Sequence, residues 1–282
     1  MHYCRRNHSM MKVVSRKSEL AKWQARSLMA VLPQPSTLLV CESALDLKQD
    51  QSVRDLIGMG MSFTKEVDHF VISHKADIAC HSAKDLGLKL DLALAPLVLL
   101  ARDIPNDAWL GPRPEELPNG AVVGTDSPRR ESLINKYYPH LKVRSIRGNV
   151  GTRIERWQSG HYDAIVLAAC GIQRLALDVP YTLLPLEQFV PAMNQGIIVG
   201  TMRKDHPNFA DLYRKTDQST LRQFEVERAV GQLLSINCHE PIGIHANGQG
   251  QVFIYLGKTQ QHFVYSPEYG DLEQWIIEIL GQ

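Results

Sequence analysis

Short apolar segments alternate with amphipathic helical patterns through much of this chain of 282 residues. Lys12–Ser15 has the pattern of a strand, and a helical pattern follows it with Leu20, Trp23 and Leu28 on one face. Thr37–Cys41 is the next strand-like segment. Strands that alternate with helices predict an α/β layer structure with a largely parallel sheet.

The same alternation returns in the middle of the chain. Ala121–Val123, Lys142–Ser145 and Ala164–Ala168 have strand patterns, and helical patterns begin between them at Pro128 and Val150. We therefore predict a second α/β part of similar construction.

Interruptions of this pattern predict where one domain ends and another begins. The segment 103–107 crosses into a second domain, and the segment 189–200 crosses back. From about Gln218 onward, a helix, two strands and a closing helix predict a small α+β domain. The predicted division is a disordered lead-in at 1–10, domain 1 at 11–102 and 196–216, domain 2 at 103–195 and domain 3 at 217–282.

Two arginine-rich turns follow strand patterns in the predicted second domain. Arg129 and Arg130 come after Ser127-Pro128, where a serine N-cap and a proline would open a helix. Arg147 and Arg153 flank a second turn of small residues. Helix N-termini favour anions, and arginine adds a forked donor for carboxylate or phosphate. A solvated basic helix face is the alternative for any one arginine, but two such turns predict a ligand with several anionic groups.

Polar residues also end two strand patterns of the predicted first domain. Arg16 and Ser18 stand at the first strand–helix turn, where Ser18 would also serve as an N-cap. Lys84 and Asp85 follow a strand pattern that ends at residue 80. A carboxylate in this place can stabilise a cation and accept protons from it. The alternative is a surface turn with a weak ion pair.

The composition argues against several classes of function. The 31 Lys+Arg residues nearly balance the 30 Asp+Glu residues, so the whole chain is not built to coat nucleic acid. No apolar run of about 18 residues is present, and the N-terminal segment lacks an apolar core, so neither a membrane span nor a secretory signal is predicted. Five cysteines without a C-x-x-C pair indicate a reducing cytoplasm rather than structural zinc or disulfides.

Cys238 differs in its surroundings from the other four cysteines. It lies on a predicted turn between polar residues, just before Pro241-Ile242-Gly243. Thiol chemistry needs access of this kind. A lone cysteine is more often a small buried hydrophobe, so both interpretations stay open on the residues alone.

Six stretches of the chain resemble one enzyme family, both in sequence and in order. They are SRKSELAKWQ (15–24), HSAKDL (81–86), GTDSPRR (124–130), RSIRGNVGTRIERW (144–157), YDAIVLAACGIQRL (162–175) and NCHEPIG (237–243). Together they resemble the porphobilinogen deaminase (hydroxymethylbilane synthase) family from about Lys12 to the end of the chain. RGNVGTR after GTDSPRR is a very specific combination.

This resemblance implies a fold and a reaction. The first two domains are expected to form two lobes like those of type II periplasmic binding proteins, followed by a small α+β C-terminal domain. The family links four porphobilinogen molecules head to tail with loss of ammonia, on a dipyrromethane cofactor held by one cysteine through a thioether. The released hydroxymethylbilane enters tetrapyrrole (haem) biosynthesis. We expect a cytoplasmic monomer whose partner is porphobilinogen, with neither nucleic acid nor membrane.

The resemblance also implies roles for individual residues. Cys238 would carry the cofactor, and Asp85 would be the catalytic aspartate that stabilises azafulvene-type cations. The residues expected to bind the cofactor are Ser82, Lys84, Thr125, Ser127, Arg129 and Arg130. The residues expected to bind the substrate are Arg16, Ser18, Arg147 and Arg153. Porphobilinogen carries an acetate and a propionate, so the growing chain has the many carboxylates that the arginine turns predict.

The chain departs from the family pattern at several positions. The loop before Phe63 usually holds two lysines, and Leu56 and Gly60 stand in their places. Glu19 replaces a usual proline, and Asn194 replaces a glycine. The missing lysines predict a slower enzyme with the same type of reaction.

Two alternatives remain at the level of sequence. A catalytically weak or non-catalytic two-lobed binding protein for a carboxylate-rich ligand would keep the arginines, but it has no use for Cys238 or a third domain. A single-strand nucleic-acid binder could stack bases on Tyr137 and Tyr138. The balanced charge and the placement of the arginines at strand ends argue against the second alternative.

Overall fold

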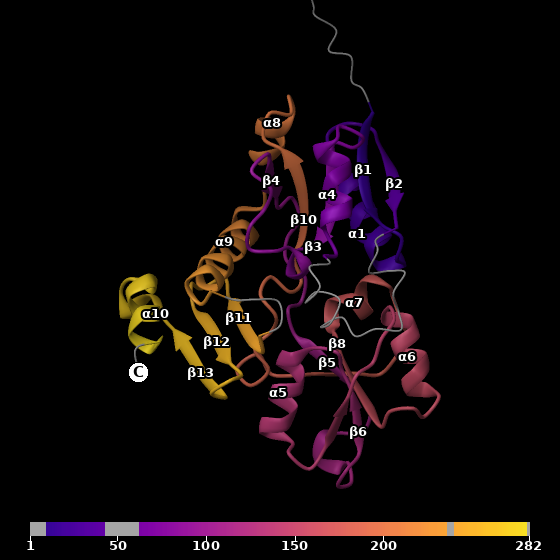
Figure 1. Cartoon of the computed structure of the whole chain (residues 1–282), viewed down its shortest axis with the longest axis vertical. Coiled ribbons are helices and arrows are strands. Elements are labelled where there is room, and N and C mark those ends of the chain that lie inside the picture. Colours follow the sequence, from indigo (N-terminus) through magenta and orange to yellow (C-terminus); the bar gives the residue numbers. More distant parts are fainter. Residues whose placement is uncertain (1–9, 43–61, 236–239, 281–282) are drawn as a thin grey trace, which may run out of the picture.

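The computed structural model describes residues 10–42, 62–235 and 240–280 (Figure 1). The described chain forms two five-stranded sheets and one three-stranded sheet. We call the part built on the first five-stranded sheet lobe 1 and the part built on the second lobe 2. In Figure 1, lobe 1 lies at the top, lobe 2 below it, and the three-stranded sheet to one side. The predicted class, two α/β lobes with a small α+β C-terminal domain, is confirmed. Each sheet falls within one predicted domain, while the domain boundaries themselves remain predictions.

Lobe 1 is built around a sheet with the strand order β2-β1-β3-β10-β4. Its elements are β1 (Met11–Arg16), α1 (Glu19–Ala30), β2 (Ser36–Cys41), α4 (Lys65–Ile72), β3 (Ile78–Ser82), the 3₁₀ turn η1 (Ala83–Asp85), β4 (Leu94–Leu97), β10 (Ile198–Arg203) and α8 (Phe209–Tyr213). Val13 and Val14 of β1 belong to different cores, because successive strand side chains point to opposite faces. Both faces of this sheet are therefore covered.

Lobe 2 has a second sheet with the order β7-β6-β8-β5-β9. Its elements are β5 (Asp107–Leu110), η2 (Pro114–Glu116), β6 (Val122–Gly124), α5 (Pro128–Tyr137), β7 (Lys142–Arg144), α6 (Val150–Gln158), β8 (Ala164–Ala168), α7 (Ala169–Arg174) and β9 (Thr182–Leu183). Ile165 and Val166 of β8 also lie in different cores. This sheet is thus covered on both faces like the first.

The strands of each five-stranded sheet run largely parallel, as predicted, except for one strand in each lobe. β10 is antiparallel to β3 and β4, and β5 is antiparallel to β8 and β9. β10 and β5 each follow a crossing between the lobes, so each enters its sheet from the opposite end.

The two segments that cross between the lobes contact each other. The N–H of Asp103 donates to the carbonyl of Gly196 at 3.1 Å, and Arg174 Nε donates to Asp103 Oδ2 at 2.8 Å. A Cβ on Gly196 would lie 2.5 Å from the Asp103 oxygen, so only glycine fits. Asn194, which replaces the usual glycine, has φ 60°, a conformation that asparagine tolerates better than most residues.

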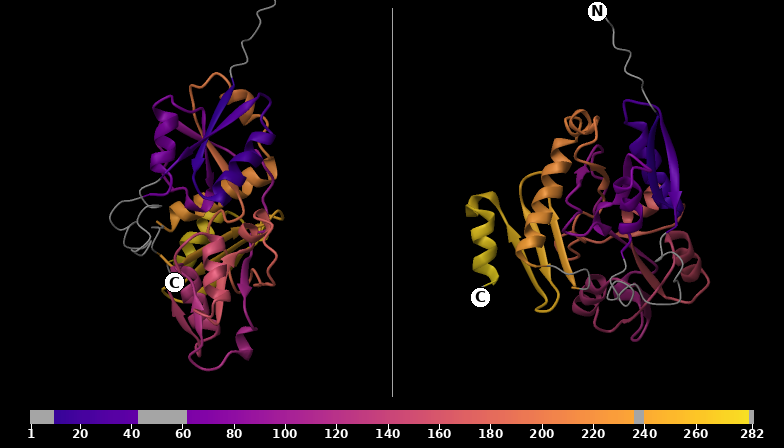
Figure 2. Two further views of the ribbon diagram at one scale, coloured as in Figure 1. Left: turned by 90° about the vertical axis from the view of Figure 1, so that its right-hand side faces the viewer. Right: turned by 45° about the horizontal axis from the view of Figure 1, so that its top comes forward.

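The C-terminal part joins both lobes. It contains α9 (Gln218–Leu233), β11 (Ile242–Ala246), β12 (Val252–Leu256), β13 (Gln261–Tyr265), η3 (Pro267–Tyr269) and α10 (Leu272–Leu280). Phe224 near the start of α9 packs in a core with residues of lobe 1, whereas Val230 packs on the three-stranded sheet. Figure 2 shows α10 on the side of this sheet that faces away from the lobes.

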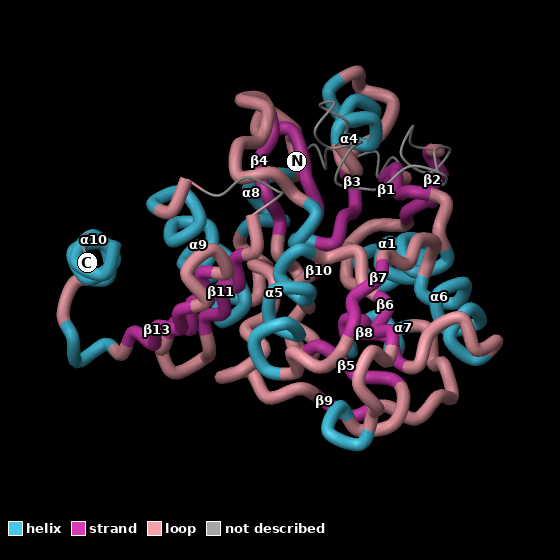
Figure 3. Tube along the Cα trace, turned by 60° about the horizontal axis from the view of Figure 1, so that its bottom comes forward, coloured by secondary structure: helices cyan, strands magenta, loops and turns pink. Residues whose placement is uncertain are grey.

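The three-stranded sheet also lies against α5 of lobe 2 (Figure 3). Ser132 Oγ of α5 is 2.7 Å from the Tyr255 hydroxyl of β12, and Tyr255 is fully buried in a core of lobe 2. His262 Nε2 donates to the carbonyl of Gln188 at 2.9 Å. Both the start of α9 and the sheet therefore hold the C-terminal part in place.

Candidate functional site

A cavity of about 120 Å³ opens at the end of strand β3 in lobe 1. It is lined by five of the residues that the sequence singled out: Arg16, Ser18, Ser82, Lys84 and Asp85. They come from the ends of the parallel neighbours β1 and β3, which meet at one edge of the sheet. The structure thus brings together two clusters that lie far apart in sequence.

Local hydrogen bonds position the polar groups at this edge. Ser18 is the N-cap of α1, and its hydroxyl accepts from the Ala21 N–H at 3.2 Å. The Ser82 hydroxyl is paired with the Gln24 side chain, whose Nε2 lies 2.8 Å from Ser82 Oγ. The Arg16 guanidinium lies over the Phe63 ring, 4.5 Å from its centroid. Gln24 and Phe63, both in the cavity wall, were not predicted.

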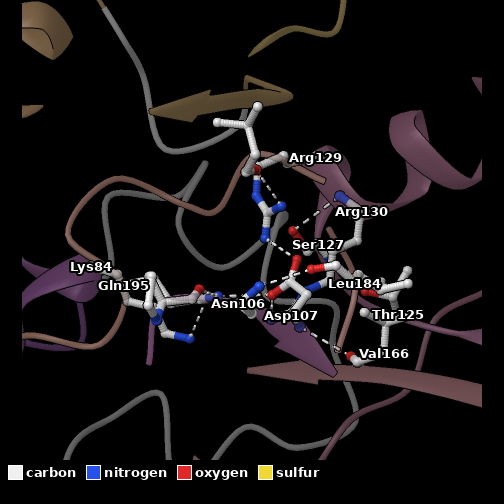
Figure 4. A network of polar contacts seen from close by, with 12 residues as sticks. Lys84, Asn106, Asp107, Thr125, Ser127, Arg129, Arg130, Val166, Leu184 and Gln195 are labelled. Carbon is white, nitrogen blue, oxygen red and sulfur yellow. Dashed lines mark hydrogen bonds and ion pairs between the residues drawn. The ribbon is translucent and has the colours of Figure 1, made fainter. Parts of the chain in front are cut away.

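Arg129 and Arg130 lie at the start of α5, where the Ser127 hydroxyl accepts from the Arg130 N–H as predicted for an N-cap. Both guanidinium groups point inward and form ion pairs with the Asp107 carboxylate (Figure 4). Arg129 Nη2 is 2.8 Å from Asp107 Oδ2, and Arg130 Nη2 is 2.7 Å from Asp107 Oδ1. The two arginines are therefore parts of a buried ion cluster.

Asp107 is the residue that sequence reasoning missed. Its side chain is fully buried. Burial by itself raises the pKa of such a carboxyl, but the charges of Arg129 and Arg130 outweigh it and hold the pKa well below its usual range. The sequence did contain a signal for this residue. Two neighbouring arginines stand at the start of a helix that packs inward, and buried charges need a partner of opposite charge.

The arginines of this cluster still have hydrogen-bond donors that a further anion could accept from. Each arginine also donates through Nη1 to a carbonyl, of Val190 for Arg129 and of Val166 for Arg130. Their Nε groups are buried and have no hydrogen-bond partner among the described residues. One carboxylate facing two guanidinium groups also leaves one positive charge in excess. Thr125 and Ser127 lie beside this cluster, and Thr125 Oγ1 accepts from the Ser127 N–H at 3.2 Å.

Lys84 and Gln195 connect the cavity to the arginine cluster (Figure 4). Lys84 Nζ donates to Gln195 Oε1 at 3.2 Å, and Gln195 Nε2 donates to Asp107 Oδ1 at 2.8 Å. Burial lowers the pKa of Lys84, as does the charge of Arg130, while the carboxylates of Asp85 and Asp107 act in the opposite direction. Lys84 is thus within electrostatic reach of both sites.

The second predicted arginine turn opens α6. Asn149 is its N-cap and accepts from the Thr152 N–H at 2.9 Å, and Gly148 before it has φ 107°. Arg153 Nε donates to the Gly148 carbonyl at 2.8 Å, and Arg147 Nη1 is 3.7 Å from Asp126 Oδ2.

Positive charge exceeds negative charge around this second turn. Burial lowers the pKa of Arg153 to about 10, and the charges of Arg130, Arg147 and Arg156 act in the same direction against that of Asp126. A site where guanidinium groups lower one another's pKa is stabilised by an added anion. The charge of Arg130 thus acts on both Lys84, at the cavity, and Arg153, at the second turn.

Cys238 and the loop positions Leu56 and Gly60 lie outside the described residues. Among the described residues, no group of three or more His, Cys, Asp or Glu side chains could hold a metal ion. No helix in the described part of the chain is long and apolar enough to cross a membrane.

The sequence is similar to proteins of known families. A family model, porphobilinogen deaminase, dipyrromethane cofactor binding domain, matches residues 11–211. The chain is 34% identical over 275 residues to a porphobilinogen deaminase of Coxiella burnetii, covering 93% of this chain and 89% of that protein. It is 36% identical over 266 residues to a porphobilinogen deaminase of Nitrosomonas europaea, covering 91% and 84%.

Solved structures are similar at a much lower level. The probable amino-acid ABC transporter extracellular-binding protein ytmK from Bacillus subtilis is 10% identical, with a TM-score of 0.41. The alignment covers 79% of this chain and 96% of that chain. A likeness this weak carries no argument about function.

Proposed function

Because the chain belongs to the porphobilinogen deaminase family of transferases, we propose that it condenses four porphobilinogen molecules into hydroxymethylbilane with loss of ammonia. The observation that carries this proposal is one continuous site. Asp85 lines a cavity with Arg16 and Ser18, and Lys84 joins that cavity to the cluster of Asp107 and two arginines. Cationic donors around one carboxylate suit a substrate with several carboxylates and a cationic reacting centre.

The family's dipyrromethane cofactor fits the residues that are present. The Nε groups of Arg129 and Arg130 are buried donors without partners among the described residues, and the excess positive charge there favours the binding of an anion. Ser82, Lys84, Thr125 and Ser127 would hold the cofactor with these arginines, and Cys238 would carry it through a thioether. When bound, the cofactor supplies the pyrrole carbon to which the first porphobilinogen is joined.

The side chains of the cavity have separate tasks in the proposed reaction. Arg16 and Ser18 bind the acetate and propionate of the incoming porphobilinogen. The Asp85 carboxylate stabilises the cation that forms as ammonia leaves, and it then accepts the proton that the coupled pyrrole carbon releases. Arg147 and Arg153 bind carboxylates of the lengthening chain. We also propose that the absence of lysines at residues 56 and 60 makes the enzyme slow rather than inactive.

The test begins with the purified protein and porphobilinogen. We expect ammonia release, a product that cyclises to uroporphyrinogen and is then oxidised by iodine or air to uroporphyrin for detection, and a protein mass increased by two pyrrole units. Peptide mapping should locate this addition on Cys238 and on none of the other four cysteines. A protein that binds porphobilinogen but neither gains this mass nor releases ammonia would instead be a non-catalytic binding protein.

A further inference from the structure

Three buried side chains from different elements meet behind the cavity of lobe 1. His81 of β3 lies with its Nε2 2.9 Å from Asp68 Oδ1 of α4 and 3.3 Å from Thr201 Oγ1 of β10. The Thr201 hydroxyl donates to Asp68 Oδ1 at 2.5 Å. The exposed fraction is 2% for the His81 side chain and 12% for the Asp68 side chain. None of these three side chains has a role in the proposed reaction.

The hydrogen bonds determine which nitrogen of His81 carries a proton. Thr201 has one hydroxyl hydrogen, and it points to Asp68. Nε2 of His81 therefore faces two oxygen atoms that can only accept from it, so Nε2 must carry a hydrogen. In the neutral ring Nδ1 then has a free lone pair, because one imidazole nitrogen donates while the other accepts. No described residue forms a hydrogen bond with Nδ1.

His81 is one of the residues that line the cavity together with Asp85. The other polar side chains of the wall include the donors of Arg16 and Lys84, which suit carboxylates. Porphobilinogen also has a cationic aminomethyl group, which needs acceptors. The negative charge of Asp68, held against the far side of the ring, makes the neutral imidazole a better acceptor for a cation.

We infer that His81 is a substrate contact: Nδ1 accepts a hydrogen bond from the ammonium group of the incoming porphobilinogen, and Asp68 with Thr201 fixes the required tautomer. This inference rests on the proposed function. It assigns the aminomethyl group to the β3 side of the cavity, while Arg16 and Ser18 take the carboxylates. His81 would thereby select a pyrrole that still carries its amine.

Two substitutions of His81 separate the cavity side of the ring from its buried side. In His81→Gln the new amide can reach the Nε2 position and keep the contact with Asp68, but no acceptor remains at Nδ1. In His81→Asn the shorter amide replaces Nδ1 and loses the contact with Asp68. We expect KM for porphobilinogen to rise about 10- to 100-fold in His81→Gln, as for a lost hydrogen bond to a charged group. His81→Asn should keep more of the affinity.

A substrate analogue and a control variant sharpen the experiment. The pyrrole dicarboxylate that lacks the aminomethyl group should bind wild type and His81→Gln within about twofold of each other. His206→Gln alters another His–Asp pair, whose Nε2–Oδ1 distance to Asp77 is 3.1 Å and which lies outside the cavity residues. It should leave KM within about twofold of wild type. A His81→Gln enzyme with unchanged KM would overturn the inference.

Nuclear magnetic resonance provides a measurement that does not depend on these variants folding. With ¹⁵N-labelled histidine, His81 should show a protonated Nε2 and an unprotonated Nδ1, and the Nδ1 signal should shift when porphobilinogen binds to Asp85→Asn protein. A protonated Nδ1 in the neutral ring, or no shift on binding, would contradict the inference. Failure of the wild-type protein to release ammonia would contradict the proposed function instead.

Discussion

Arg102 Nη1 lies 2.5 Å from Glu227 Oε1, and this buried ion pair joins the crossing into lobe 2 to helix α9. Arg102 Nε also donates to the carbonyl of Gln195 at 2.9 Å, and Glu227 Oε1 accepts from the Ala246 N–H at 2.8 Å. The pair therefore holds both crossings and the C-terminal sheet at one point. It links the C-terminal part, which is expected to carry the cofactor, to the segments that cross between the lobes.

Loss of the Glu227 charge should destabilise the protein. Glu227→Gln leaves the Arg102 guanidinium buried without its counter-charge, so we expect the free energy of unfolding to fall by about 3 kcal/mol. Urea denaturation measures the effect. Glu225→Gln on the exposed side of the same helix is the control, and it should change the free energy by less than about 0.5 kcal/mol. Equal effects of the two variants would show that the pair adds no specific stability.

Stability should fall in acid because of Asp107. Its pKa in the folded protein is lowered, since the charges of Arg129 and Arg130 outweigh the effect of burial. A carboxyl with a lowered pKa stabilises the folded state above its unfolded pKa of about 4, and this contribution is lost as the pH falls toward the folded pKa. We expect Asp107→Asn to be less stable at pH 7 and to lose less stability below pH 4. A parallel pH dependence of both proteins would contradict this.

Asp85→Asn should separate cofactor attachment from turnover. The variant keeps the shape of the side chain and removes the charge that stabilises the cationic intermediate. We expect kcat to fall at least about 100-fold, as when a major electrostatic contribution is lost. The mass addition at Cys238 should survive. Asp91→Asn, an exposed aspartate on the following loop, is the matched control. Turnover of Asp85→Asn within about threefold of wild type would reject the proposed role.

Arg147 and Arg153 should act at different stages of chain growth. Arg147→Leu and Arg153→Leu each remove one cation from the second turn, so each should stall a different partly elongated complex. Native gels and intact masses would identify these complexes. Arg129→Leu should behave differently, because it removes one of the two charges paired with the buried Asp107 carboxylate. Its main effect should be a lower free energy of unfolding, rather than a stall at one stage of chain growth. If Arg147→Leu and Arg153→Leu only raised KM equally, with no trapped complexes, a general anion patch would describe the turn better.

Restored lysines should speed up the enzyme. The double variant Leu56→Lys, Gly60→Lys, in the segment outside the described residues, should raise kcat/KM through attraction of the porphobilinogen carboxylates. The gain should shrink as salt rises, because ions screen exposed charges over about 10 Å at 0.1 M. A Leu56→Gln, Gly60→Gln variant controls for side-chain length. No gain over this control at low salt would show that the missing lysines do not limit the rate.

Features that depend on local chemistry were predictable from the sequence. Ser18 and Ser127 form the predicted helix N-caps, because a cap is set by backbone N–H groups only a few residues away. The alternation of strands and helices predicted two α/β lobes for the same reason, since each pattern is read over a short stretch. The strand-end positions of Arg16 and Asp85 followed from this alternation, and both residues line one cavity.

Pairings between distant residues were decided only by the tertiary structure. Arg129 and Arg130 were predicted to bind anionic groups of a ligand, but their ion pairs with Asp107 of strand β5 were not predicted. The antiparallel entry of β5 and β10 depends on how the chain crosses between the lobes, and no local pattern records that path. His81 meets Asp68 and Thr201 only because α4 and β10 pack around β3. The sequence by itself determined which groups can carry charge and where helices begin, whereas only packing determined which charges are buried and with which partners, because burial requires each charge to find a counter-charge across the fold.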